Sequence, residues 1–309
     1  MEGITSGIRT RFQIISDTHG AEFTPETTPL TRADVVIHCG DLTEESKLEE
    51  FQATIRLLKS LDADLKLVLA GNHDFTLDVP VFRTKITEAG LQSDMDTVVR
   101  TYGDYGEARQ LFEDAAGITF LDEGIHRFNL SNGASLTVYA SPYTPSASGW
   151  GFAYHPENGH DFSIEDSVDV VITHGPPRGI SDYTLARQRA GCPKLFEAVA
   201  RARPQLHCFG HIHEGWGARL VTWRDEPSEV PSHFTDIDND RSITIAKLST
   251  LKERKNEHQL ERCCSTSHCT GDANPIEKET QTLFVNAAIQ GIDEQQPPWV
   301  VDIELPKVP

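Results

Sequence analysis

Apolar runs of strand length alternate along this chain with segments whose apolar residues recur at helical spacing. Three early runs have the length of buried strands: residues 11–16, 34–40 and 65–71. Segment 44–61, between the second and the third, predicts an amphipathic helix, because its apolar residues fall three or four positions apart: Leu48, Phe51, Ile55, Leu58 and Leu61. Strands that alternate with helices predict a layered α/β fold.

The same alternation continues to residue 305, with one interruption. Further helical patterns cover residues 79–90, 105–117 and 193–203. Further strand patterns cover residues 118–122, 125–130, 135–141, 168–175, 206–210, 282–289 and 298–305.

The interruption runs from Arg224 to Gln281, where the chain is polar and charged apart from a short apolar stretch at 242–251. We predict one domain over residues 1–309, with 224–281 an insertion that forms a surface loop. Strands 217–223 and 282–289 would pair directly beneath it. We therefore expect that a short linker can replace residues 226–279 without loss of metal or activity.

Charge and composition narrow the classes of partner. The chain has 28 Lys and Arg residues and 47 Asp and Glu residues, which gives a formal net charge of −19. A negative charge of this size disfavours binding to polymeric nucleic acid. No stretch approaches 18 apolar residues, and the N-terminal segment lacks a signal-peptide core, so we expect a soluble, cytoplasmic protein without a membrane partner. The six cysteines do not form a disulfide framework. The sequence does not set the oligomeric state.

Side chains that bind metals follow five of the predicted strands. Because the carboxyl ends of strands in an open α/β sheet meet at one edge, we expect these side chains to gather there. His211 and His213 are two positions apart, so in extended backbone both imidazoles point to the same side. Oxygen and imidazole donors without a thiolate suit Mn, Fe, Zn, Mg or Ni. The candidates are too many for one ion and predict two: Asp17, His19, Asp41, Asn72, His174, His211 and His213.

In their order and spacing, these strand-end motifs resemble those of the calcineurin-like metallophosphoesterases. The matching segments are Asp-Thr-His at 17–19, Gly-Asp at 40–41, Gly-Asn-His-Asp at 71–74, Thr-His-Gly-Pro-Pro at 173–177 and Gly-His-Ile-His at 210–213. Segments 141–154 and 284–288 are similar, within that family, to the brain metallophosphoesterase-domain proteins and their fungal relatives. The resemblance implies a four-layer α-β-β-α sandwich with a dimetal site at the strand ends.

The resemblance also implies a role for each motif residue. One cation, with Mn the leading choice, would be held by Asp17, His19, Asp41 and His213, and the other by Asp41, Asn72, His174 and His211. His73 matches a histidine that contacts the phosphate without binding metal. Some relatives orient that histidine with an acidic side chain, and both Glu44 and Asp74 are candidates for that role.

These roles imply a phosphoesterase that cleaves small phosphodiesters with a hydroxide held between two cations, and cyclic nucleotides are the leading substrate class. The alternatives are a phosphomonoesterase or another ester hydrolase on the same scaffold, a nuclease, or a nucleotide-binding or scaffold protein with residual activity. Three aromatic residues near the motifs are candidates either for stacking on a base or for a structural role: Trp150, Phe152 and Trp216.

Two further sets of residues have simpler interpretations. His38 and His207 lie within strand patterns, so we expect them to be packing residues. The cysteines at 263, 264 and 269, with His258 and His268, do not have the spacing of the usual zinc sites.

Overall fold

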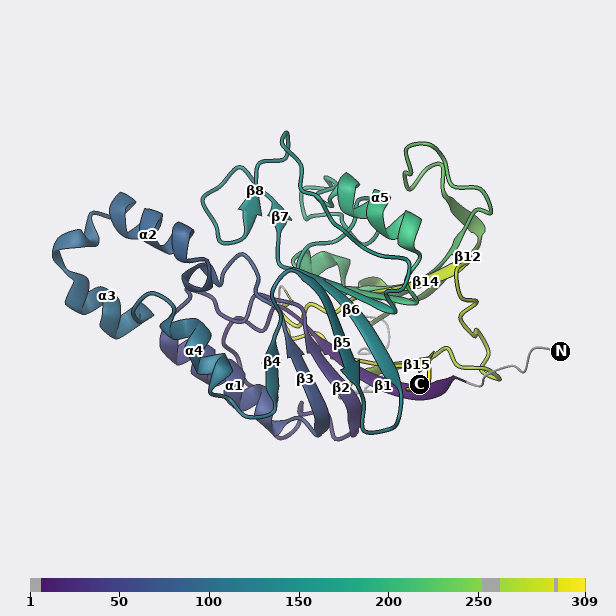
Figure 1. The fold of residues 1–309 in the computed structure, drawn as a ribbon, viewed down its shortest axis with the longest axis horizontal. Coiled ribbons are helices and arrows are strands. Elements are labelled where there is room, and N and C mark those ends of the chain that lie inside the picture. The colour runs from purple at the N-terminus through teal and green to yellow at the C-terminus, as the bar shows by residue number, and fades with distance from the viewer. Residues whose placement is uncertain (1–6, 252–261, 292–293, 309) are drawn as a thin grey trace.

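Two β-sheets lie face to face at the centre of the molecule, and helices cover their outer faces (Figure 1). The computed structural model describes residues 7–251, 262–291 and 294–308. The first sheet has the order β13-β15-β1-β2-β3-β4, and the second has the order β12-β11-β14-β10-β9-β6-β5.

The strands of the first sheet are β1 (Ile8–Ile15), β2 (Ala33–His38), β3 (Ala63–Val68), β4 (Ile118–Phe120), β13 (Cys264–Ser267) and β15 (Trp299–Leu305). Those of the second are β5 (Gly124–Asn129), β6 (Ser135–Ser141), β9 (Val170–Thr173), β10 (Leu206–Phe209), β11 (Gly217–Trp223), β12 (Ile237–Lys247) and β14 (Gln281–Asn286). A separate short pair is β7 (Thr144–Pro145) with β8 (Ala153–Tyr154).

The helices are α1 (Leu48–Ser60), α2 (Val79–Glu88), α3 (Met95–Tyr102), α4 (Glu107–Glu113) and α5 (Pro193–Ala202). Single 3-10 turns are η1 (Phe75–Leu77), η2 (Leu91–Ser93) and η3 (His213–Gly215).

The strand alternation predicted from sequence produces the layers. Along β1, Phe12 and Ile14 face the core between the two sheets, while Ile15 faces the core beneath α1 and α4. A third apolar core packs α5, through Phe196 and Val199, onto the outer face of the second sheet. The order helix, sheet, sheet, helix is the predicted four-layer sandwich, and this prediction is confirmed.

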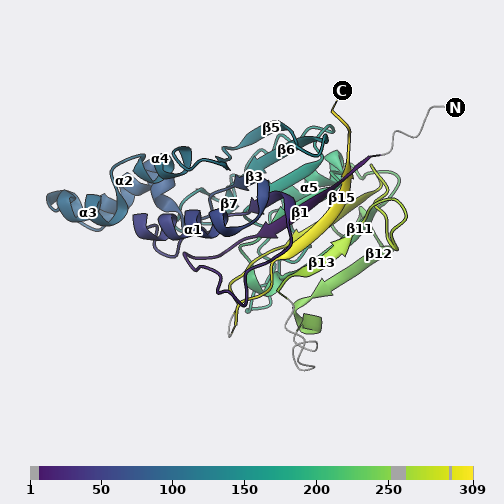
Figure 2. The ribbon, with the colours of Figure 1, turned by 90° about the horizontal axis from the view of Figure 1, so that it is seen from below.

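The prediction of a surface loop over residues 224–281 is wrong where that segment forms strands, at Ile237–Lys247 and Cys264–Ser267. β12 pairs antiparallel with β11, and β13 pairs parallel with β15, so the segment supplies an edge strand to each sheet (Figure 2). Its polar composition is compatible with this role because an edge strand keeps much of its surface in water. The direct pairing of β11 with β14 occurs as expected. The helix α3 was not predicted from sequence, although its apolar residues lie on one face.

None of the helices in the described part of the chain combines the length and the apolar character that a membrane span requires.

Replacing residues 226–279 with a short Gly/Ser linker should therefore destabilise the protein, contrary to the expectation from sequence. The replacement removes β12, β13 and apolar side chains that pack against the core between the sheets, including Ile245, Cys264 and Ile276. The expected loss in free energy of unfolding is on the order of 3 kcal/mol, because a fully buried large apolar side chain contributes about 1.5–3 kcal/mol and Ile245 and Ile276 are half-buried. Thermal and urea unfolding followed by circular dichroism would measure it, and an unchanged midpoint would contradict this account.

Candidate metal centre

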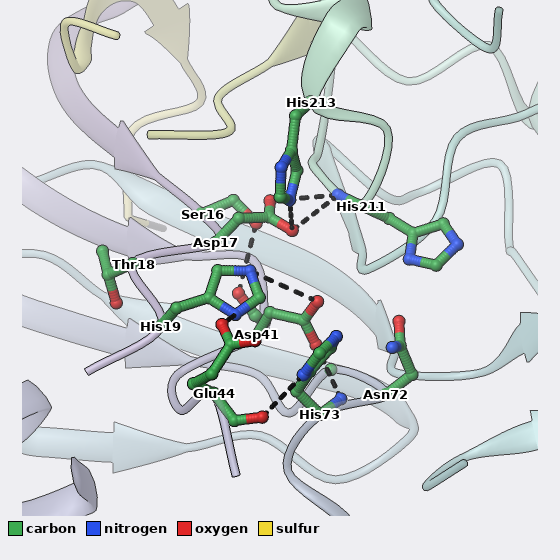
Figure 3. Close-up of polar contacts among 12 residues, drawn as sticks. Ser16, Asp17, Thr18, His19, Asp41, Glu44, Asn72, His73, His211 and His213 are labelled. Atoms are coloured by element: carbon green, nitrogen blue, oxygen red, sulfur yellow. Dashed lines mark hydrogen bonds and ion pairs between the residues drawn. The ribbon is translucent and has the colours of Figure 1, made fainter. Parts of the chain in front are cut away.

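The candidate ligands converge where the carboxyl ends of the two sheets meet. Asp17, Asp41 and Asn72 follow β1, β2 and β3, which are parallel neighbours in the first sheet. His174 follows β9, and His211 follows β10, its parallel neighbour in the second sheet. Figure 3 shows the side chains from both sheets facing a common centre.

The backbone at these strand ends is unusual. Four of the candidates have a positive φ, which is uncommon for residues other than glycine: 53° at Asp17, 48° at His19, 52° at Asp41 and 66° at His211. Gly210 allows the close approach, since a Cβ there would lie 1.9 Å from Oδ2 of Asp17. The strained turns therefore place polar side chains within a few ångströms of one another, where ordinary loops would separate them.

The first group of donors comprises Asp17, His19 and His213, whose ligand atoms lie within 4.8 Å of one another. The Asp17 carboxylate is fully buried and accepts the backbone N–H of His211 at 3.0 Å. Its Oδ1 lies 3.3 Å from Nε2 of His213. Burial would raise the pKa of Asp17, but His213 and His174 outweigh this effect and lower it to about 2.

The second group comprises Asp41, His174 and His211, again within 4.8 Å. Oδ1 of Asp41 lies 3.3 Å from Nε2 of His174, which is also 2.9 Å from Oδ1 of Asn72. Burial and the nearby His174 lower the pKa of His211 to about 4. The imidazole of His211 is therefore neutral at physiological pH and can offer a lone pair to a cation.

Asp41 links the two groups. Its Oδ2 lies 3.9 Å from Nε2 of His19, on the side of the first group, while its Oδ1 faces His174 in the second. Oδ1 also accepts the backbone N–H of His73 at 2.9 Å. Burial opposes ionisation of Asp41, yet His174 holds the pKa of this carboxyl well below its usual range. One carboxylate therefore offers an oxygen to each side of the centre.

Two imidazole nitrogens show that this donor set fits cations. Nε2 of His19 is buried and has no hydrogen-bond partner among the described residues. Nδ1 of His174 donates to the carbonyl oxygen of Cys39 at 3.0 Å, so in the neutral ring Nε2 carries a lone pair. That lone pair would face the oxygen atoms of Asn72 and Asp41, so without a cation Nε2 carries a proton, and a bound cation would take the place of that proton. The residues present therefore suit two bound cations.

His73 also lies at the centre, because its ligand atom is within 4.8 Å of those of His19 and Asp41. Its Nδ1 donates to the backbone carbonyl of Glu44 at 2.7 Å, which leaves Nε2 free to face a ligand. Its ring packs against Trp150 with the ring centres 4.6 Å apart and an interplanar angle of 33°. The ring centre of His19 is 4.8 Å away.

The carboxylates of the two acidic candidates, Glu44 and Asp74, make other contacts. The Glu44 carboxylate lies 2.9 Å from Nδ1 of His19, and only its backbone oxygen reaches His73. The Asp74 carboxylate accepts the backbone N–H groups of Leu42, Thr43 and Gly71, so it holds the backbone of the loop that follows Asp41. Burial and the charge of Asp41 raise the pKa of Asp74 to about 7. Neither carboxylate contacts the His73 ring in this structure, and an orienting role for Glu44 or Asp74 stays a prediction.

Several secondary candidates turn out to be structural. His38 and His207 are buried, as predicted, and pair with threonine hydroxyls at 2.9 Å. Trp216 is buried and stacks on Trp299, so it is unavailable to a base.

No candidate metal group in the described ranges includes Cys263, Cys264, Cys269 or His268, and His258 lies outside the described residues.

Comparison with known proteins agrees with this geometry. The family model of the calcineurin-like phosphoesterases matches residues 10–215, which contain all the candidate ligands. The chain belongs to the calcineurin-like phosphoesterase family.

This chain is similar to two curated proteins in particular. It is 33% identical over 217 residues to human metallophosphoesterase domain-containing protein 1, a match that covers 67% of this chain and 62% of the human protein. It is 32% identical over 216 residues to the probable rhamnogalacturonate lyase C of Emericella nidulans, a match that covers 69% of this chain and only 18% of that protein. The match thus spans less than two thirds of either relative.

We predict that the affinity of this protein for a divalent cation rises with pH. Burial would lower the pKa of His174, but Asp41 and Asp17 outweigh it and raise it to about 9 in the metal-free protein. A cation bound at Nε2 must displace that proton at any pH below about 9. Affinity should rise by up to roughly tenfold per pH unit between pH 6 and 8. Calorimetric titration with Mn²⁺ in buffers of different ionisation enthalpy would show proton release, and a pH-independent affinity would contradict the assignment.

Proposed function

We propose that this protein is a metal-dependent hydrolase of small phosphodiesters, with cyclic nucleotides the leading substrate class. The observation that supports it best is the pair of donor groups joined by Asp41, at the junction of the two sheets. Ligand roles for all seven candidates follow from the proposal: Asp17, His19, Asp41 and His213 on one side, and Asp41, Asn72, His174 and His211 on the other. Two bound divalent cations would polarise the phosphate and acidify a water molecule.

The charges at the centre would favour the binding of a phosphate, although the protein as a whole is acidic. Asp17 and Asp41 carry only half the charge of two divalent cations, and the neutral donors Asn72 and His211 add none. The loaded site is therefore positive, although the chain as a whole has a net charge of −19. An outer surface of that sign repels long polyanions, which supports small substrates over polymeric nucleic acid.

In this proposal His73 stabilises the departing oxygen. Its Nδ1 donates to the Glu44 carbonyl, so Nε2 is the atom that can give a proton to the leaving group when the ring is in its doubly protonated, cationic form. The backbone N–H of His73 is bound to Asp41, which fixes the position of the ring relative to the centre. Contact with the Trp150 ring restricts its rotation.

Hydrolysis of a panel of phosphoesters tests the proposal. With Mn²⁺, the wild-type chain should cleave 2′,3′- or 3′,5′-cyclic nucleotides and bis(p-nitrophenyl) phosphate faster than duplex DNA or phosphomonoesters. Asp41→Ala should abolish turnover and lower metal content well below that of the wild type, because both donor groups lose their shared carboxylate. A ranking with DNA first would overturn the substrate class, and near-normal hydrolysis by Asp41→Ala would overturn the mechanism.

His73→Ala should behave differently from Asp41→Ala. The variant keeps every proposed ligand, so its metal content should match that of the wild type, while turnover falls roughly 10²–10⁴-fold. The loss should be greatest for substrates with a poorly acidic leaving group, since these depend most on protonation. Metal analysis beside kcat for alkyl and nitrophenyl esters would measure both effects. Loss of metal from this variant would assign His73 to the ligands instead.

A further inference from the structure

A lysine ammonium lies at the edge of the candidate centre, supported by aromatic rings. Lys85, on α2, is half-buried, and its Nζ lies 4.9 Å from the ring centre of Phe75 and 4.8 Å from that of Trp150. The lysine ion pairs of the described chain are made by Lys47 and Lys194, not by Lys85. Its charge is thus held in place by ring faces, with no carboxylate to neutralise it.

The segment that carries Trp150 is firmly docked on the loop that carries His73. The backbone N–H of Gly151 donates to the carbonyl of Asn72 at 3.1 Å, and that of Phe152 donates to Oδ2 of Asp78 at 2.9 Å. A Cβ at Gly151 would lie only 2.9 Å from the Cα of Phe75, so the two segments are in close contact. Trp150 itself is 36% exposed, so its outer part borders solvent.

We propose that Lys85 binds a second anionic group of the substrate, beyond the phosphoester that is cleaved. The proposal rests on the phosphoesterase function inferred above and narrows its substrate class to phosphoesters that bear a further phosphate or carboxylate. Trp150 provides the intervening wall, because its ring contacts both His73 and the Lys85 ammonium.

The distances suit a substrate of nucleotide size. The ring centre of Trp150 is 4.6 Å from that of His73 and 4.8 Å from Nζ of Lys85, so the ammonium lies within about 9 Å of the His73 ring. A ribose with phosphates at both ends spans a gap of this order. In a chain of net charge −19, an unneutralised cation beside the centre also guides anions to it.

Two substrates that differ only in the second anion test this inference. They are 2′,3′-cyclic AMP and the same molecule with a 5′-phosphate, which share the scissile ring. The wild type should prefer the 5′-phosphorylated form in kcat/KM by roughly tenfold, as expected for one charge-assisted hydrogen bond at a half-exposed site. Lys85→Gln should remove most of that preference, and added salt should weaken it in the wild type.

Arg83→Gln is the matched control. Arg83 lies on the same helix and also stacks on an aromatic ring, but that ring is Tyr105, and the ring contacts of His73 are with His19 and Trp150. The control removes the same charge and should retain the wild-type preference. An equal fall in both variants, or no preference in the wild type, would overturn the role of Lys85.

A binding measurement separates this inference from the proposed function. If the wild type cleaves neither substrate, the hydrolase proposal fails and binding decides the role of Lys85. Adenosine 3′,5′-bisphosphate should then quench tryptophan fluorescence of the Mn²⁺-loaded protein at lower concentration than adenosine 3′-monophosphate, and Lys85→Gln should abolish the difference. Equal affinities in the wild type would overturn the inference in that case.

Discussion

The centre of this molecule depends on two buried carboxylates held where its two sheets meet. Burying a charge is costly unless it is paired and hydrogen-bonded. Asp17 receives the backbone N–H of His211, and Asp41 receives that of His73, so each carboxylate is bound by the loop of another strand. In the metal-free protein a proton on His174, whose pKa is raised to about 9, offsets part of the charge of the two carboxylates. The fold thus stabilises a positive charge, either a proton or a cation, between the two carboxylates.

The backbone conformation at the strand ends fixes the positions of the candidate ligands. The four candidates with positive φ are each forced into a sparsely populated region immediately after a strand that is anchored in the core. Gly40 and Gly71 flank this arrangement, and a Cβ at Gly71 would lie 2.2 Å from the backbone nitrogen of Asp41. The strain is sustained by the surrounding sheets, which explains why the ligands come from strand ends instead of long loops.

The parts of this structure that could be predicted from sequence are the locally encoded ones. A strand followed by a glycine and a polar donor is a short motif, so the candidate ligands and the layered fold were accessible from spacing alone. β12 and β13 were not, because an edge strand such as Cys264–Ser267 owes its position to a partner far along the chain. The position of the Glu44 carboxylate beside His19 could not be predicted either, because a turn produces it and a turn leaves no periodic pattern in the sequence. Lys85 was missed because it reads as one polar position of an amphipathic helix.

The division of the ligands between two sheets has a mechanical consequence. Asp17, Asp41 and Asn72 move with the first sheet, whereas His174 and His211 move with the second. A cation bound to both sets is a cross-link between the halves of the sandwich, and it closes long loops of chain as a disulfide would. Any motion that parts the sheets at this end must break coordination bonds. Binding of the cation and association of the two sheets are therefore coupled. A chelator that removes the cation would also weaken the packing of one sheet on the other.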